Sequence, residues 1–304
     1  MAEKTIKKES QFFTFYGGKV EIEKKPWGDN FRYYISVEKS EYRSGMISAT
    51  GATKYLDKSK ALIPWAVGLV GNHIKNKIES STAKSFLKEE IFLLVDEAIA
   101  KPEEAKVKGG EAGTLIHDYA YDFAKAVIGK LPLPTLDHLD KENETHAKAL
   151  NGISAFLDWY NGHKVKFFAM EQLVYYNSFL SGDTKKGEEV IEFFGIIDLF
   201  AEVDKENQVI DYKSSKGVYS DQRYQVSCYF KGWNANTDNK KKANSAHILN
   251  FNKETGDLIE KNIPAEEVEK DFKAFKGLLV VANREKELDA EYQASKKAQK
   301  NESK

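Results

Sequence analysis

The feature that most constrains the fold is the segment 191–213, in which two apolar, β-rich runs flank the polar tetrad 204–207. This pattern is typical of a β-hairpin that uses the tetrad as its loop. A four-residue loop places Asp198 opposite Lys213 on the neighbouring strand. Asp211 precedes Lys213 by two residues, so both side chains point to the same side of the sheet. The spacing therefore predicts that two carboxylates and one ammonium group converge on one face.

This convergence needs a physical reason because its surroundings are apolar, as in a central strand that is covered on both faces. The apolar neighbours are Phe193, Phe194, Ile196, Ile197, Leu199, Phe200 and Ile210. Charges buried among them are costly unless they pair with each other or bind a metal. One interpretation is a structural Asp–Lys pair at the end of the sheet. The other is a divalent-cation site, in which Lys213 holds a water or offsets charge on a phosphate.

Four short motifs occur in a recognisable order along the chain. They are Gly113-Thr-Leu-Ile-His117, Gly195-Ile-Ile-Asp198, Ile210-Asp-Tyr-Lys-Ser-Ser215 and Gln225-Val-Ser-Cys-Tyr229. Together they resemble the PD-(D/E)XK nuclease superfamily and most closely its RecB-like branch, which includes phage exonucleases and the mitochondrial genome maintenance exonuclease. The resemblance runs from about Ser48 to Glu285 and is densest between Glu171 and Tyr229.

The resemblance implies an α/β fold with a PD-(D/E)XK core, a mixed central sheet flanked by helices, and an N-terminal helical and β extension. It also implies a site that binds Mg²⁺ or Mn²⁺ and hydrolyses phosphodiester bonds. The implied metal ligands are Asp198, Asp211, the Tyr212 carbonyl and His117. The implied catalytic residues are Asp198, Asp211, Lys213, Gln225 and Tyr229. A lone His on a helix is more often structural, and only the motif match favours a functional His117.

The resemblance gives weaker expectations for residues around this site. Glu171, within the expected strand 165–176, supports the metal shell by resemblance, although an exposed strand glutamate is an equal alternative. Thr50, Lys54, Trp65 and Lys216 are candidate DNA-binding residues. The alternative for this second group is that Trp65 belongs to the core and the lysines are merely solvated.

The function expected from these features is a metal-dependent DNA exonuclease that acts on single strands or ends in replication, recombination or repair, in a phage or bacterium. A structure-specific or restriction-type endonuclease is one alternative, and a catalytically idle nucleic-acid-binding module is another. CRISPR-associated RecB-like nucleases are a less favoured relative because their cluster-binding cysteines are missing. We therefore expect no iron–sulfur cluster.

Composition sets limits on the class of protein. The single cysteine, Cys228, excludes an intramolecular disulfide and a four-cysteine metal site. No run of eighteen apolar residues predicts a membrane span, and the first residues lack the pattern of a secretory or transit peptide. A cytoplasmic protein is expected. The net charge of −1 does not itself indicate DNA binding, but positive charge can be concentrated locally.

Periodicity and break signals predict the order of elements. Residues 1–45 are expected to form a small β element, 46–286 the nuclease domain with its core at 113–286, and 287–304 a charged tail that continues the last helix or frays. Strands are expected at 165–176, in the hairpin, and at 246–252. Helices are expected at 82–104, 114–128, 142–161, 221–234 and 264–286. The first of these should end near Pro102, and a loop at 106–113 should follow it.

Overall fold

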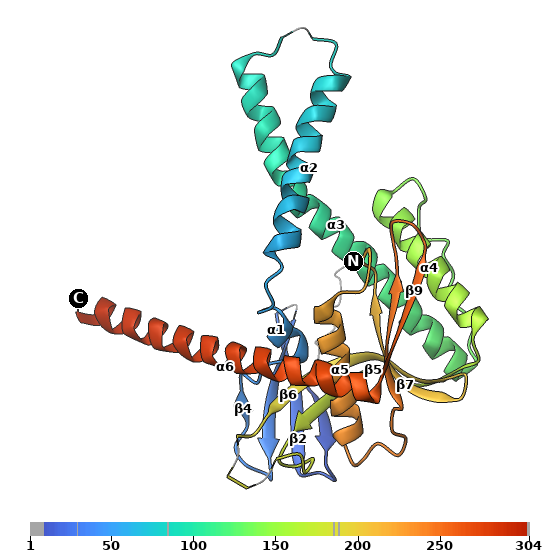
Figure 1. The fold of residues 1–304 in the computed structure, drawn as a ribbon, viewed down its shortest axis with the longest axis vertical. Helices are drawn as coiled ribbons and strands as arrows, with labels where there is room; N and C mark the ends of the chain where they lie inside the picture. The colour runs from blue at the N-terminus through green and yellow to red at the C-terminus, as the bar shows by residue number, and fades with distance from the viewer. Residues whose placement is uncertain (1–8, 29, 84, 185, 188, 303–304) are drawn as a thin grey trace, which may run out of the picture.

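The computed structural model describes residues 9–302 except 29, 84, 185 and 188, and its centre is a five-stranded mixed sheet (Figure 1). The strands, in their order across the sheet, are β5 (Val165–Asn177), β6 (Glu192–Val203), β7 (Glu206–Lys213), β8 (Ser245–Phe251) and β9 (Leu258–Pro264). Neighbouring strands are antiparallel except for the pair β7–β8, which is parallel. The predicted α/β class with a mixed sheet is present.

Helices cover both faces of this sheet. The helices of the described chain are α1 (Ala49–Thr53), α2 (Ser59–Ser80), α3 (Lys88–Gly129), α4 (Glu144–Gly162), α5 (Ser220–Ala235) and α6 (Ala265–Glu302), of which α2 does not lie on the sheet. On one face, α3 and α4 pack on a core that includes Ile210 and Leu249, while on the other α5 and α6 pack on Val209 and Ile248. Because successive strand residues face opposite layers, covering both layers requires the uninterrupted apolar runs seen in the sequence.

A second, four-stranded sheet lies at the N-terminal end of the chain. It consists of β1 (Gln11–Phe15), β2 (Val20–Trp27), β3 (Asn30–Val37) and β4 (Arg43–Ser44), all antiparallel. Its buried side chains, among them Val20 and Ile35, share a core with Leu173 and Phe194 of the central sheet. The N-terminal sheet is therefore packed onto β5 and β6.

The hairpin between β6 and β7 differs from its predicted register. Its loop has two residues, Asp204 and Lys205, with φ values of 50° and 77°, as in the primed turns that suit a two-residue hairpin. Val203 consequently pairs with Glu206, so the predicted placement of Asp198 opposite Lys213 was wrong by two residues. Side chains alternate with a period of two, and a shift of two residues therefore keeps each side chain on its predicted face.

The predicted break between residues 101 and 114 was also wrong. Helix α3 runs without interruption from Lys88 to Gly129 and includes Pro102 and the Gly109–Gly110 pair. Fully buried alanines hold the helix on both sides of this stretch, and Lys253 Nζ donates a hydrogen bond to the Gly109 carbonyl at 2.8 Å. Tertiary contacts thus override the local helix-breaking signals, at the cost of one missing amide donor at the proline.

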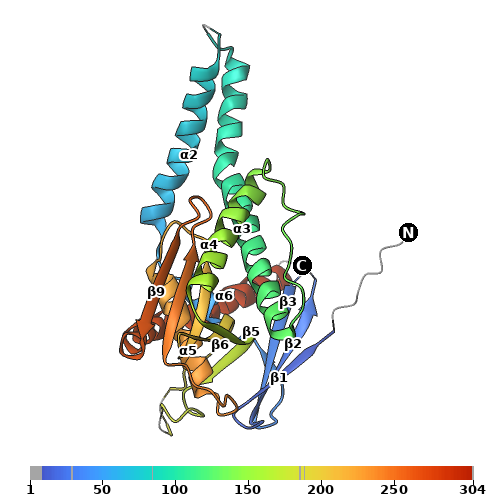
Figure 2. The ribbon, with the colours of Figure 1, turned by 90° about the vertical axis from the view of Figure 1, so that its right-hand side faces the viewer.

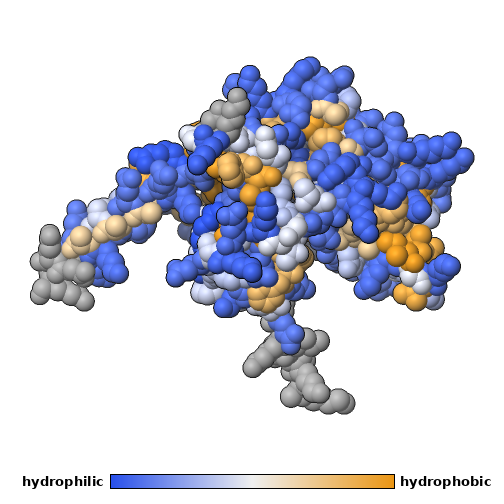
Figure 3. Space-filling model, turned by 90° about the horizontal axis from the view of Figure 1, so that it is seen from below, coloured by the Kyte–Doolittle hydropathy of each residue, from blue (hydrophilic) through white to orange (hydrophobic). Residues whose placement is uncertain are grey.

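Two helical segments extend from the body of the molecule. Helix α2 and the first half of α3 form an antiparallel hairpin that projects away from the sheets (Figures 1 and 2). At the other end of the chain, α6 continues through the predicted tail to Glu302, and Figure 3 shows this projecting end to be mostly hydrophilic. Within the described chain, no helix is long and apolar enough to cross a membrane.

His247 on β8 makes the stability of this sheet depend on pH. Its ring is buried against Gln208 of β7, with Nδ1 2.9 Å from Oε1, and burial lowers the pKa of His247 to about 4. The neutral ring therefore stabilises the fold above about pH 6.5, and this contribution is lost as the pH falls towards 4. We expect the free energy of unfolding to fall by about 3 kcal/mol over that range from this residue alone.

This prediction is checked by urea unfolding of the wild type and of His247→Gln at several pH values. The variant, which cannot titrate there, should show a flatter dependence on pH between 4 and 7. Parallel curves for the two proteins would contradict the assignment to His247.

Candidate active site

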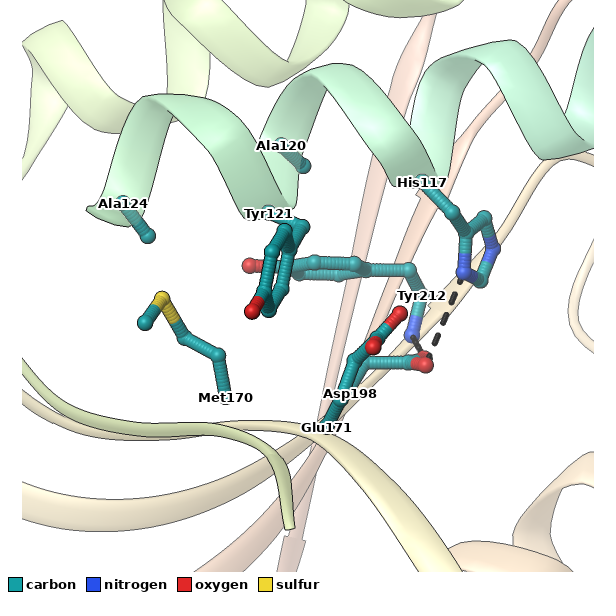
Figure 4. A pocket seen from close by; sticks show the side chains of 8 residues that line it. All are labelled: His117, Ala120, Tyr121, Ala124, Met170, Glu171, Asp198 and Tyr212. Carbon is teal, nitrogen blue, oxygen red and sulfur yellow. Dashed lines mark hydrogen bonds and ion pairs between the residues drawn. The ribbon is translucent and has the colours of Figure 1, made fainter. Parts of the chain in front are cut away.

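The candidate site lies where β6 and β7 separate. The backbone ladder between these strands stops at the pair Leu199–Ile210, one residue before Asp198. There the Asp198 side chain takes over the role of a strand partner, because its Oδ2 accepts a hydrogen bond from the Tyr212 amide at 2.6 Å. Its other oxygen, Oδ1, lies 3.5 Å from His117 Nδ1 on α3 (Figure 4). One carboxylate thus connects two strands and a helix.

Asp211 and Lys213 form the second half of the site. The Asp211 carboxylate is almost fully buried and forms an ion pair with the Lys213 ammonium group. The ion pair joins Lys213 Nζ to Asp211 Oδ2, so this buried oxygen has the ammonium group as its partner. Removal of either member of a buried pair would leave an uncompensated charge, which is strongly destabilising.

The titrating groups of the site influence one another. Burial raises the pKa of Asp211 to about 6 although Lys213 opposes the shift. Burial would also raise the pKa of Asp198, but the His117 ring, Lys213 and the Tyr212 amide hold it below its usual range. For His117 and Lys213, burial lowers the pKa while the neighbouring carboxylates raise it, and the carboxylates prevail. The site therefore favours charged His117 and Lys213 and resists a second full negative charge.

Helix α5 brings two predicted residues to this site. Gln225 Nε2 donates hydrogen bonds to Tyr229 Oη at 2.6 Å and to Thr50 Oγ1 at 2.8 Å. Thr50 belongs to α1, a short helix whose start is capped by the Ser48 side chain. The structure places Thr50, a candidate DNA contact, in a hydrogen-bonded group with the two α5 residues.

Two glycines of the motifs have a steric explanation. A Cβ on Gly195 would lie 2.4 Å from the Tyr229 ring, and a Cβ on Gly113 would lie 2.9 Å from Ser214 Oγ. Gly113 therefore lets α3 approach the chain directly after Lys213. The expected start of a helix at residue 114, directly after Gly113, was wrong, since both residues lie far inside α3.

Glu171 lines the same hollow as His117 and Asp198 (Figure 4). Its φ of 46° and its absence from the β5–β6 ladder mark an irregularity in β5. Burial raises the pKa of Glu171, and Asp198 and Asp118 raise it further, whereas Lys24 of β2 lowers it. Asp118 and Lys24 were not anticipated from the sequence. Asp118 directly follows the histidine of its motif, but no sequence signal connects β2 with the site.

The remaining predicted DNA-binding residues lie outside this cluster. Lys54 ends α1, Lys216 lies in the loop after β7, and both are exposed. Trp65 is on α2 and 40% exposed, so the alternative that it belongs to the core was wrong.

The donor groups of the site fit a hard divalent cation in chemical type. Asp198 and Asp211 offer carboxylate oxygens, and His117 offers an imidazole nitrogen once its proton is released. In the described part of the chain, no three His, Cys, Asp or Glu side chains come close enough together to hold a metal ion by themselves. Mg²⁺ commonly binds through one or two carboxylates and completes its shell with waters and substrate phosphate, so such a donor set is sufficient in kind.

Comparisons with known proteins add little to this geometry. No family model matches the chain, and no curated protein matches it. Twelve chains of solved structures match, among them the crystal structure of SSO0001. That chain is 11% identical, the match covers 69% of this chain and 85% of that one, and the TM-score is 0.25. A TM-score this low carries no argument about fold or activity.

The contact between Gly195 and Tyr229 can be tested by substitution. Gly195→Ala should lower the free energy of unfolding by about 1–3 kcal/mol, because the new methyl group overlaps a buried ring. The matched control is Gly68→Ala on α2, where a Cβ meets nothing within 4 Å and alanine favours the helix. Chemical denaturation measures both variants. An equally stable Gly195→Ala protein would show that the ring does not rest on this glycine.

Proposed function

We propose that this chain is a divalent-metal-dependent DNA nuclease with a PD-(D/E)XK core of the RecB-like branch. The observation that carries the proposal is the gathering of Asp198, Asp211, Lys213 and His117 where β6 and β7 separate. Structural ion pairs also occur at sheet ends, but an Asp–Lys pair does not need a second carboxylate and an imidazole beside it. The order of the four motifs along the chain adds support.

The proposed reaction is hydrolysis of a phosphodiester. A water oxygen attacks phosphorus and the water gives up a proton, the bond from phosphorus to the 3′ oxygen breaks in line, and this oxygen takes up a proton. The products are a 5′-phosphate and a 3′-hydroxyl. Mg²⁺ or Mn²⁺ held by Asp198, Asp211, the Tyr212 carbonyl and His117 would supply Lewis-acid stabilisation of the phosphate.

Lys213 acts in this scheme as a donor and not as a base. The carboxylates of Asp211 and Asp198 hold its pKa above the ordinary value against the effect of burial, so it stays protonated at neutral pH. A fixed ammonium group can orient a water by donating a hydrogen bond to it, and can offset charge that develops on the phosphate.

Tyr229 and Gln225 extend the site on the side of α5. Burial raises the pKa of Tyr229, which therefore remains a neutral hydroxyl, and the Gln225 amide fixes its oxygen. In the proposed complex these groups hydrogen-bond near the scissile phosphate, and Thr50 holds Gln225 in place. Exposed Lys54, Lys216 and Trp65 are proposed contacts to the rest of the DNA strand.

The proposal is tested with end-labelled linear single-stranded DNA and a circular single strand, in Mg²⁺, Mn²⁺ or EDTA. Lys213→Ala and Asp198→Asn should each lower the cleavage rate by about a hundredfold or more, because each removes a group that stabilises transition-state charge. Lys261→Ala, which removes an exposed lysine on the edge strand β9, serves as the matched control and should leave the rate unchanged.

The outcomes separate three functions for this site: an exonuclease, an endonuclease and an idle binding module. Metal-dependent shortening of the linear strand alone supports the exonuclease form of the proposal, which otherwise derives from the sequence motifs. Cutting of the circle supports an endonuclease on the same core. Binding of DNA without cleavage in any metal would support an idle binding module and overturn the nuclease assignment.

A further inference from the structure

The helical hairpin formed by α2 and the first half of α3 has little core of its own. No residue of α2 is buried, and residues 88–111 of α3 contribute only Ala98 to the buried set. Two helices alone cannot cover both of their broad sides, and a projecting hairpin normally exposes polar residues there. This hairpin instead exposes many large aliphatic side chains.

These side chains form two stripes. Helix α2 contributes Ile63, Val67 and Ile78, and helix α3 contributes Ile91, Val95 and Ile99, each between 37 and 65% exposed. Spacings of four and eleven residues place the members of each stripe on one side of their helix. We refer to the six residues as the aliphatic face.

Both stripes belong to one side of the hairpin. His73 of α2 lies 3.5 Å from Glu97 of α3, which marks one side of the seam between the helices. At about 100° per residue, both stripes fall on the other side of that seam, where half-buried Ile74 connects them. The aliphatic face is therefore continuous across both helices and larger than isolated surface residues would give.

Charge identifies the partner that would fit this face. Helix α2 carries three lysines and one glutamate, whereas residues 88–104 of α3 carry six acidic residues and two lysines. In a dimer whose twofold axis runs parallel to the two helices, the acidic α3 of the second copy lies over the basic α2 of the first copy. An isologous twofold contact needs this kind of self-complementary surface.

The height of the charges along the hairpin fits the same arrangement. The His73–Glu97 contact shows that these two residues are level with each other. Lys75 and Asp96, each within two residues of that level, flank the aliphatic face on its two outer edges. In the twofold arrangement Lys75 of each copy therefore lies beside Asp96 of the other. A twofold axis perpendicular to the helices would instead stack the basic α2 of one copy on the basic α2 of the other, which like charges disfavour.

We propose that two copies of this chain associate through their aliphatic faces and form a four-helix bundle from two hairpins. The bundle buries the stripes that a single hairpin leaves in water, and the α2–α3 charge pairs set its direction. This inference does not depend on the nuclease proposal, since it concerns a surface that shares no residue with the candidate active site.

The test is sedimentation velocity of the full-length protein over a range of concentrations. The wild type should sediment as a dimer, and Val67→Glu with Ile99→Glu should raise the dissociation constant by more than about tenfold, or about 1.4 kcal/mol. Leu93→Glu changes an equally exposed side chain on the other side of α3 and should leave the dimer intact. Circular dichroism confirms that each variant remains helical.

Charge reversal tests the arrangement directly. Lys75→Glu alone and Asp96→Lys alone should each weaken the dimer, and the two together should restore it, because the pair is remade with exchanged signs. A wild type that stays monomeric at every concentration overturns the proposal, as does a dimer unaffected by Val67→Glu with Ile99→Glu. If a monomer binds single-stranded DNA or lipid vesicles through the aliphatic face, this face is a binding site for DNA or lipid and the dimer proposal is overturned.

Discussion

The hydrogen bond from the Tyr212 amide to the Asp198 carboxylate is the contact on which the candidate site depends. A continued backbone ladder would have closed the space between β6 and β7, whereas a side-chain acceptor lets the two strands part while the amide stays satisfied. Because the strands part there, His117 can approach from α3 and Gln225 and Tyr229 from α5. The bond uses one oxygen of Asp198 and leaves the other directed at His117.

The site is arranged at the expense of stability. Asp211 is almost fully buried, and its raised pKa reflects the cost of burying its charge. Lys213 and His117 reduce that cost without removing it. A protein selected for stability alone would place apolar residues here, as β7 does at the adjacent Ile210.

The sequence predicts which side chains gather in this region better than it predicts their detailed geometry. Alternation along β6 and β7 correctly placed Asp198, Asp211 and Lys213 together even though the loop length was wrong, because an error of two residues preserves the faces. The helices on the sheet also followed from periodicity, and the mixed sheet followed from the resemblance. The continuous α3 did not, because buried alanines and a lysine 144 residues away hold the helix through its proline and glycines. Likewise, Lys24 reaches Glu171 only through the packing of one sheet on another, which no local pattern records.

Helix α3 links the projecting hairpin to the carboxylate site, with Ile99 and His117 separated by eighteen residues, or about 27 Å of helix. A rigid rod of this length would act as a lever, and any tilt of the hairpin would displace His117. Pro102 lies between the two positions and lacks the amide that would complete the hydrogen bonding there. The helix therefore has one backbone hydrogen bond fewer between its outer half and the half that carries His117 than a helix without proline would have.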